Sequence, residues 1–334
     1  MSSTGPRVSV VIAAFNAEAS IGRAIRSVLA SAAIDVEVLV VDDGSRDRTA
    51  GLVREIAADD RRVRLIETPA NGGPARARNL GIEHARGEWL AILDADDAFR
   101  PGRLASLLRI ARASGATMVA DNLRLVDPAG RVLATAMAAG DRALWSWIAA
   151  ETFIRRNLFN GRGFRFGYLK PIIRRQVLSA NGIRYDQDLK VAEDYHLYLD
   201  CFLAGGTMAL TPAPLYDYTQ TPGSTSRALG RADVERLLAA NAEAIEHTSG
   251  ELRAALTERQ ADIRTTLAHM RFLELIKARR PLDALGTLAR RPAAWPVALR
   301  GGRESVAKRF RRLIPTPSEL IVDTTQIDRG AFRL

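Results

Sequence analysis

Short apolar segments alternate with amphipathic segments through the first third of this chain. Four apolar runs are typical of buried strands, at residues 8–14, 36–41, 63–67 and 89–93. Three segments between them carry apolar residues at helical spacing, at residues 19–31, 49–58 and 74–85. This alternation predicts an α/β fold in which helices flank a mostly parallel central sheet. Sheets of this kind bind ligands beyond the carboxyl ends of their strands.

The pattern becomes less regular after residue 100. Helices are expected at residues 101–114, from about residue 193, and from about 232 to 278, with one more strand at residues 117–121. The last part of the chain, from residue 279, is basic and is interrupted by prolines. A helical extension is therefore expected to follow the α/β region.

Positive charge is concentrated near the carboxyl end. The chain has 334 residues and a net charge of +10, and residues 271–312 contain twelve Lys or Arg against three acids, which gives +9 of that charge. The single cysteine, Cys201, excludes an intrachain disulfide, and the four dispersed histidines lack zinc-type spacing. The sequence shows neither a signal-peptide pattern nor an apolar run of about 18 residues. We therefore expect a cytoplasmic protein without a membrane span.

An apolar run ends in three carboxylates in the segment LAILDADD, where Asp94, Asp96 and Asp97 follow Leu93. Clustered carboxylates repel one another, and their burial is unfavourable unless a cation is present. Asp94 and Asp96 could both reach one hard divalent cation, which in turn could hold a diphosphate. Asp-x-Asp also occurs in exposed turns, so this pattern alone leaves both interpretations open.

Two other strand ends carry groups suited to a nucleotide. Asp42 and Asp43 follow the second strand, where a carboxylate could accept the imide N–H of uracil or could simply belong to an Asp-Gly turn. Glycines and arginines at residues 71–79 could bind an anion at the start of a helix, or could form a loop and a solvated basic helix face.

Two candidate groups lie further along the chain. Glu193 and Asp194 open a helix, where they could interact with the helix dipole or could supply a general base. The loop at residues 219–226 follows Tyr216 and Tyr218. It could close over a site with these tyrosines stacking on a sugar, or it could be an ordinary loop after an edge strand.

The order of these segments is more specific than any one of them. VSVVIAAFNAEASIGRAIRSVL, VLVVDDGSRDRT, NGGPARARNLGIEHARGEWLAILDADD and AEDYHLYL follow one another over residues 7–226. Together they resemble the inverting family 2 glycosyltransferases of the GT-A fold. This resemblance implies a Rossmann-like sheet, a nucleotide-sugar donor that is usually UDP-linked, and Mg²⁺ or Mn²⁺ as cofactor. It also implies a GT-A domain at residues 1–226 and a helical, basic extension at residues 227–334.

The resemblance assigns roles to particular residues. The nucleoside site would contain Phe15, Glu18, Asp42 and Asp43, and Arg76, Arg78 and Asn79 would lie near the donor. Asp94 and Asp96 match the metal and diphosphate motif. Asp194 matches the catalytic base, with Glu193 as its companion. Tyr218, Ser224 and Ser226 fall in the loop near donor and acceptor.

The sequence departs from the family pattern in two respects. The family often has proline where Ala13 or Ala14 stands and tyrosine where Phe15 stands, so this residue can stack but cannot donate a hydroxyl hydrogen bond. The Q-x-x-R-W motif of processive synthases is also missing, which indicates a single-addition enzyme. GYLKPIIRR, EDYHLYL and LYDYTQTPGSTS are similar to segments of the succinoglycan-type glucosyltransferases of bacterial exopolysaccharide assembly.

The expected function is the metal-dependent transfer of one hexose, glucose from UDP-glucose, to a saccharide acceptor in exopolysaccharide or cell-surface glycan biosynthesis. The acceptor would be linked to a lipid diphosphate at the inner face of the plasma membrane. The basic tail, with Trp295 and Phe310, could bind that anionic surface, or it could be a solvated helix pair or an oligomer contact.

Two other classes of protein share some of these features. A sugar 1-phosphate nucleotidyltransferase would need a glycine-rich, basic loop after the first strand, and residues 13–22 do not provide one. The G-x-G-x-x-G and P-loop patterns are missing as well. A nucleic-acid-binding protein is suggested by the basic pI of about 10.4. Carboxylates on the expected ligand face argue against it, so no nucleic-acid partner is expected.

Overall fold

The structure is a computed structural model that describes residues 6–31, 33–141, 143–161, 163–220, 229–290 and 295–296. These residues form two compact units. The first unit contains the described residues up to Ala150 and those from 166 to 220, and the second contains residues 151–165 together with those from 229 onward. The division at residue 226 stays a prediction, and the structure adds that residues 151–165 group with the later helices.

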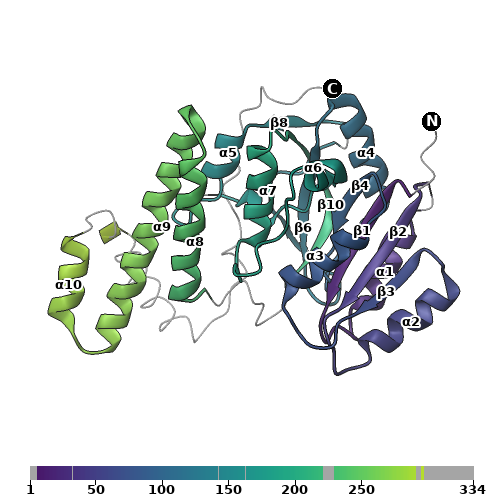
Figure 1. Cartoon of the computed structure of the whole chain (residues 1–334), viewed down its shortest axis with the longest axis horizontal. Coiled ribbons are helices and arrows are strands. Elements are labelled where there is room, and N and C mark those ends of the chain that lie inside the picture. Colours follow the sequence, from purple (N-terminus) through teal and green to yellow (C-terminus); the bar gives the residue numbers. More distant parts are fainter. Residues whose placement is uncertain are drawn as a thin grey trace. The chain divides into compact units, whose positions relative to one another are not determined.

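A mixed sheet forms the centre of the first unit (Figure 1). Its strands in chain order are β1 (Val8–Ala14), β2 (Val36–Asp42), β3 (Val63–Glu67), β4 (Trp89–Ile92), β5 (Ala98–Phe99), β6 (Met118–Val126), β7 (Val132–Thr135), β8 (Ser146–Ile148), β9 (Ile172–Arg174) and β10 (Met208–Thr219). Their order across the sheet is β3-β2-β1-β4-β9-β6-β10-β5, and β7 pairs with β6 and β8 with β10. The predicted α/β fold, with helices flanking a central sheet, is confirmed.

The longer strands share one direction. β1 pairs in parallel with β2 and β4, β2 with β3, and β6 with β10, while β9 is antiparallel to both β4 and β6. The carboxyl ends of β1, β2, β4, β6 and β10 therefore meet at one edge of the sheet. β10 lies between β6 and β5, so the strand before the loop at residues 219–226 is not an edge strand of this sheet.

Helices cover the sheet because their apolar faces pack against it. They are α1 (Ile21–Leu29), α2 (Thr49–Asp59), α3 (Pro74–His84), α4 (Arg103–Ser114), α6 (Arg175–Ala180) and α7 (Glu193–Leu203), with a 3₁₀ turn at Phe166–Tyr168. Ile21, Ile25 and Val28 of α1 are fully buried, as their helical spacing predicts. α3 approaches β1 closely, because a Cβ atom added at Gly81 would lie 2.3 Å from Val11 Cγ1.

A buried ion pair joins α4 to β6. Arg103 and Asp121 have no exposed side-chain surface, and Arg103 Nη2 lies 2.7 Å from Asp121 Oδ1. Burial raises the pKa of Asp121, and Arg103 opposes this shift. Arg103 also donates to the carbonyl of Lys170. The Arg103–Asp121 pair therefore fixes the backbone at Lys170.

Removing one partner of this pair should strongly destabilise the first unit. Arg103→Met leaves the Asp121 carboxylate buried without its cation, and the expected loss is roughly 3–5 kcal/mol in the free energy of unfolding. The double variant Arg103→Met/Asp121→Leu removes both charges and should be the more stable of the two. Urea denaturation measures both, and a double variant that is no more stable than the single variant would contradict this explanation.

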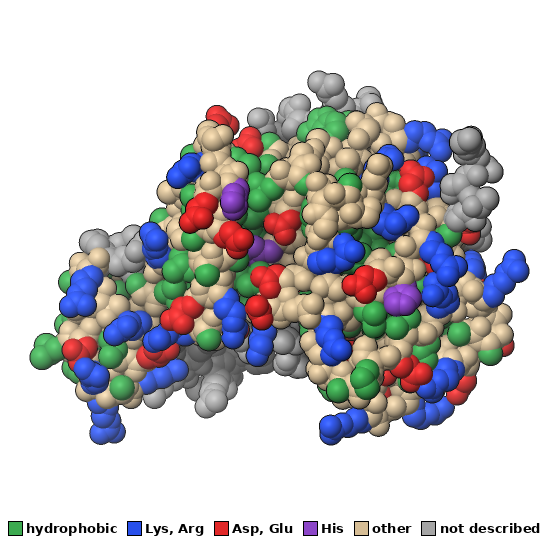
Figure 2. Space-filling model, viewed as in Figure 1, with side chains coloured by type: hydrophobic (Ala, Val, Ile, Leu, Met, Phe, Trp, Pro, Cys, Tyr) green, Lys and Arg blue, Asp and Glu red, His purple; other side chains and the backbone are tan. Residues whose placement is uncertain are grey.

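The second unit contains the helices α8 (Arg231–Glu246), α9 (Gly250–Lys277) and α10 (Pro281–Ala289), together with all but the first residue of α5 (Ala150–Arg155). Val234 and Leu237 of α8 are buried, as are Leu256 and Ile263 of α9. α10 packs on α9 through Leu288, which contacts Ala268 and Phe272. Lys and Arg side chains lie among hydrophobic ones over α10 and the end of α9 (Figure 2). A helical extension is thus present among the described residues.

Candidate active site

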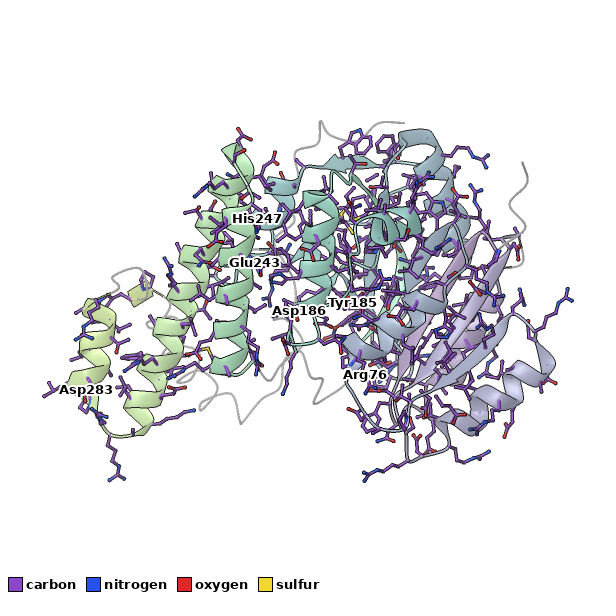
Figure 3. The ribbon with its side chains drawn as sticks, in the orientation of Figure 1. Arg76, Tyr185, Asp186, Glu243, His247 and Asp283 are labelled. Atoms are coloured by element: carbon purple, nitrogen blue, oxygen red, sulfur yellow. The ribbon has the colours of Figure 1, made fainter. Side chains whose placement is uncertain are left out.

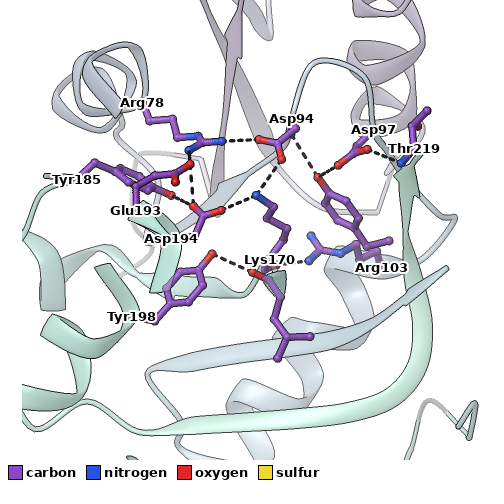
Figure 4. Close-up of polar contacts among 12 residues, drawn as sticks. Arg78, Asp94, Asp97, Arg103, Lys170, Tyr185, Glu193, Asp194, Tyr198 and Thr219 are labelled. Atoms are coloured by element: carbon purple, nitrogen blue, oxygen red, sulfur yellow. Dashed lines mark hydrogen bonds and ion pairs between the residues drawn. The ribbon is translucent and has the colours of Figure 1, made fainter. Parts of the chain in front are cut away.

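Arg78 and three carboxylates from distant segments meet beyond the ends of the central strands (Figure 4). Asp94 follows β4, Glu193 and Asp194 begin α7, and Arg78 lies in α3. Arg78 Nη2 is 2.7 Å from Asp94 Oδ1, and Arg78 Nη1 is 2.7 Å from Glu193 Oε1 and 3.7 Å from Asp194 Oδ1. The fold therefore brings together four of the residues that the sequence singles out.

A lysine that the sequence analysis did not assign to the site lies at the same place. Lys170 Nζ is 2.8 Å from Asp94 Oδ2 and 2.7 Å from Asp194 Oδ2. The hydroxyl of Tyr185 donates to the other oxygen of Asp194 at 2.8 Å. Both oxygens of the Asp194 carboxylate thus have a donor, and its orientation is fixed from two sides.

The electrostatics of this cluster follow from burial and from charge pairing. Burial disfavours the charged form of Asp94, but Lys170 and Arg78 outweigh it and hold the Asp94 pKa below its usual range. Burial would lower the pKa of Lys170, but Asp194 and Asp94 outweigh it and raise that pKa well above the ordinary value. Burial and the neighbouring Asp194 raise the pKa of Glu193.

Asp97 anchors the loop that carries Asp94 and Asp96. The hydroxyl of Tyr216 donates to Asp97 Oδ2 at 2.7 Å, and the backbone N–H of Thr219 donates to Oδ1 at 2.7 Å. Burial and the charges of Asp94 and Asp96 raise the Asp97 pKa well above its usual value. Tyr216 is completely buried, so it is not available to stack on a sugar, and this part of the prediction is wrong.

The same loop has a charge pattern that fits a divalent cation. Asp94 and Asp96 are half-buried carboxylates two residues apart. Among the described residues no three His, Cys, Asp or Glu side chains form a complete ligand set. Magnesium is usually held by one or two carboxylates together with substrate phosphates and water, so two carboxylates are enough. Asp94 and Asp96 are the residues that could hold such an ion.

The predicted nucleoside-binding acids have local structural roles. Asp43 accepts hydrogen bonds from the Thr68 hydroxyl at 3.0 Å and from the backbone N–H groups of Gly72 and Gly73 at 2.9 and 2.7 Å. Asp43 therefore holds the glycine loop in front of α3. Asp42 Oδ2 accepts from the Ser45 N–H, whereas its buried Oδ1 has no hydrogen-bond partner in the part of the chain that the structure describes.

The remaining predicted residues are placed as follows. Phe15 is 46% exposed, and Glu18 accepts a hydrogen bond from the backbone N–H of Arg48. Arg76 is exposed on α3 (Figure 3). Asn79 exchanges two 2.8 Å hydrogen bonds with the backbone of Tyr185, which positions the tyrosine that contacts Asp194. Tyr218 lies half-buried near the end of β10, and Ser224 and Ser226 are outside the described residues.

Comparison with known proteins identifies the class of enzyme. The family model described as "Glycosyl transferase family 2" matches residues 9–179. The succinoglycan biosynthesis protein ExoO of Rhizobium meliloti is 37% identical over 92% of this chain and 87% of its own length. ExoU of the same organism is 34% identical over 91% of this chain and 89% of its own length. The chain therefore belongs to glycosyltransferase family 2.

Solved structures agree on the fold. TarS 1–349 of S. aureus in complex with UDP-GlcNAc superimposes with a TM-score of 0.64 at 21% identity, covering 84% of this chain and 80% of that one. The mannosyltransferase PcManGT from Pyrobaculum calidifontis, in complex with GDP-Man and Mn²⁺, gives a TM-score of 0.58 at 22% identity, over 96% and 86% of the two chains. The predicted GT-A fold is thus confirmed, and the family favours a glycosyltransferase over the two alternative classes.

Proposed function

We propose that this enzyme transfers one hexose, glucose from UDP-glucose, to a saccharide acceptor with inversion at the anomeric carbon. The observation that carries this proposal is the convergence of Asp94 and Asp194 on Lys170 at the carboxyl edge of the sheet. It puts a candidate donor-binding acid beside a candidate base. The similarity to ExoO and ExoU supports a role in bacterial exopolysaccharide or cell-surface glycan assembly.

Asp194 would act as the general base. As the acceptor oxygen forms its bond to the anomeric carbon, the bond from that carbon to the diphosphate breaks and the hydroxyl proton passes to Asp194. The transition state is oxocarbenium-like, as in other glycosyl chemistry. Glu193 is held by Arg78 next to Asp194 and would support the first turn of α7 in this role.

Asp94 and Asp96 would hold Mg²⁺ or Mn²⁺. When bound, this ion supplies positive charge that neutralises the leaving diphosphate. The complex of PcManGT with GDP-Man and Mn²⁺ supports a divalent ion. Arg78 forms ion pairs with both Asp94 and Glu193, so it would hold the metal-binding loop next to the first turn of α7.

The nucleoside would lie over the loops after β1 and β2. Phe15 is exposed enough to stack on a base, while Glu18 accepts from the backbone N–H of Arg48 and Asp43 from that of Gly73, so both acids hold neighbouring loops. Arg76 is solvent-accessible at the start of α3, where it would meet a phosphate. The TarS complexes with UDP and UDP-GlcNAc support a uridine nucleotide.

A panel of nucleotide sugars tests the function. The protein is incubated with UDP-glucose, UDP-galactose, UDP-GlcNAc and GDP-mannose, with and without Mn²⁺, and both thermal unfolding and donor hydrolysis are measured. UDP-glucose with Mn²⁺ should give the largest rise in unfolding temperature, since a ligand stabilises the state that binds it. A response to GDP-mannose alone would contradict the choice of donor.

We further propose that the acceptor is linked to a lipid diphosphate and that the second unit binds the anionic cytoplasmic face of the plasma membrane. No helix among the described residues is both long enough and apolar enough to cross a membrane. Leu282 at the start of α10 is 83% exposed, and Leu285 one turn later is 47% exposed. The exposed Arg279 and Arg280 precede them, so apolar and basic groups occur together, as in interfacial helices.

Leu282→Glu should weaken binding to anionic vesicles by about tenfold or more, since burying a leucine contributes roughly 1.5–3 kcal/mol. Co-sedimentation with phosphatidylglycerol vesicles measures this, and Leu133→Glu, at another exposed leucine, is the matched control. Equal binding to neutral and anionic vesicles would contradict the membrane role. Self-association that Leu282→Glu abolishes would identify the surface as a contact between two copies instead.

A further inference from the structure

Lys170 joins the two carboxylates to which the proposed mechanism gives different tasks. Its Nζ lies 2.8 Å from Asp94 Oδ2 and 2.7 Å from Asp194 Oδ2. Asp94 Oδ2 and Asp194 Oδ2 thus both contact the same ammonium nitrogen and lie close to each other. Without the ammonium group, the Asp94 and Asp194 carboxylates would repel each other more strongly, and only Arg78, which contacts their other oxygens at 2.7 and 3.7 Å, would still offset that repulsion.

Hydrogen bonds fix the backbone that carries Lys170. Arg103 donates to the carbonyl of Lys170, and the hydroxyl of Tyr198 donates to the carbonyl of Leu169 at 3.0 Å. The Lys170 side chain is only 4% exposed. Its ammonium group is therefore preorganised, in contrast to a surface lysine that samples many rotamers.

The contacts of Asp194 indicate what this preorganisation does. One oxygen receives the Tyr185 hydroxyl and the other receives Lys170. Asn79 fixes the backbone of Tyr185, so both donors come from rigid parts of the fold. A general base has to lie within hydrogen-bond reach of the proton that it takes, so its position controls the rate.

We infer that Lys170 is a positioning residue for acceptor deprotonation, which holds the Asp194 carboxylate at a fixed place beside Asp94. It acts through Asp194 and does not bind the donor itself. This inference rests on the proposed role of Asp194 as the base, and it adds a residue to which neither the sequence pattern nor the comparisons assign a role.

A double-mutant cycle tests this inference. Lys170→Met should lower kcat by about 100-fold, in the range of general-base effects, and should change the donor KM less than about threefold. Lys170→Arg keeps a cation, and its kcat should be at least about tenfold higher than that of Lys170→Met. In the Asp194→Asn background, Lys170→Met should cause no further loss, because two residues that act as a unit are not additive.

Binding provides a readout that is independent of turnover. Calorimetry with UDP, with and without Mn²⁺, should give the same affinity within about threefold for the wild type and for Lys170→Met. Arg62→Met removes a cation from an ion pair with Asp60 elsewhere in the first unit and is the matched control for folding and for activity. If Lys170→Met does not fold, Lys170→Gln takes its place in the same cycle.

Two results would overturn the inference. One is a loss of UDP affinity of about tenfold or more in Lys170→Met, which would make Lys170 a donor-binding residue. The other is an equal effect of Lys170→Met on turnover in the wild-type background and in the Asp194→Asn background. A wild-type protein that binds UDP but transfers no sugar would instead overturn the proposed function itself, so the two failures are distinguishable.

Discussion

Asp194→Asn should reduce sugar transfer by roughly 10³-fold, within the range that general-base catalysis contributes. Asparagine can occupy the same space and can still accept a hydrogen bond, but it cannot take the acceptor proton. Binding of UDP should change less than about threefold, because Asp194 faces Lys170 and Tyr185 and none of the loops proposed for the nucleoside. Initial rates with UDP-glucose and calorimetry with UDP provide the two measurements.

The matched control for this substitution is Asp186→Asn. Asp186 is an exposed acid that directly follows Tyr185 in the same unit (Figure 3), and its loss should leave transfer unchanged. An Asp194→Asn enzyme that retains more than about a tenth of the wild-type rate would remove Asp194 from the role of base. A loss of UDP binding equal to the loss of rate would assign it to the donor site.

Asp94→Asn should abolish the part of UDP binding that depends on a divalent ion. The substitution removes one of two proposed metal ligands and leaves Arg78 and Lys170, which are 7% and 4% exposed, without one carboxylate. Affinity for UDP in the presence of Mn²⁺ should fall at least about tenfold, whereas the affinity measured with a chelator should stay nearly constant. Because a buried charge pair is broken, the free energy of unfolding should also fall by about 3 kcal/mol.

Asp96→Ala should separate the loss of metal-dependent UDP binding from the loss of stability, which Asp94→Asn combines. Asp96 is proposed as a metal ligand, whereas the carboxylate that pairs with both Arg78 and Lys170 belongs to Asp94. Asp96→Ala should lower Mn²⁺-dependent UDP binding while leaving the free energy of unfolding closer to that of the wild type. If neither variant changed the dependence of UDP binding on Mn²⁺, the metal site would have to lie elsewhere.

The sequence predicts the first half of the fold well because local patterns determine it. β1 and β3 begin and end at the predicted residues, and the apolar spacing of α1 matches its buried face. β10 is anticipated only as a possible edge strand before residue 219, because Pro212 and Pro214 interrupt its pattern and its pairing with β6 is irregular at these positions. Its place in the sheet depends on long-range pairing with β6 and β5, which no local pattern encodes.

The site is only partly predictable for the same physical reason. Asp94 and Asp194 stand out because each follows or opens a regular element in a recognisable motif. Lys170 lies in GYLKPIIRR, a segment that the resemblance covers without giving this lysine a role, and the packing of β9 beside β4 brings it to Asp94. Asp42 illustrates the opposite case, because its Oδ2 accepts a hydrogen bond from the backbone N–H of Ser45 at 3.2 Å, the kind of local contact that the simpler turn interpretation predicts.

Crystals grown with UDP and Mn²⁺ would test the central claim most directly, through the anomalous signal of manganese. We expect one manganese peak bound to the carboxylates of Asp94 and Asp96, with the diphosphate on it and the Asp194 carboxylate beside it, still held by Lys170 and Tyr185. A nucleotide and metal bound away from Asp94, Asp96 and Asp194 would contradict this claim.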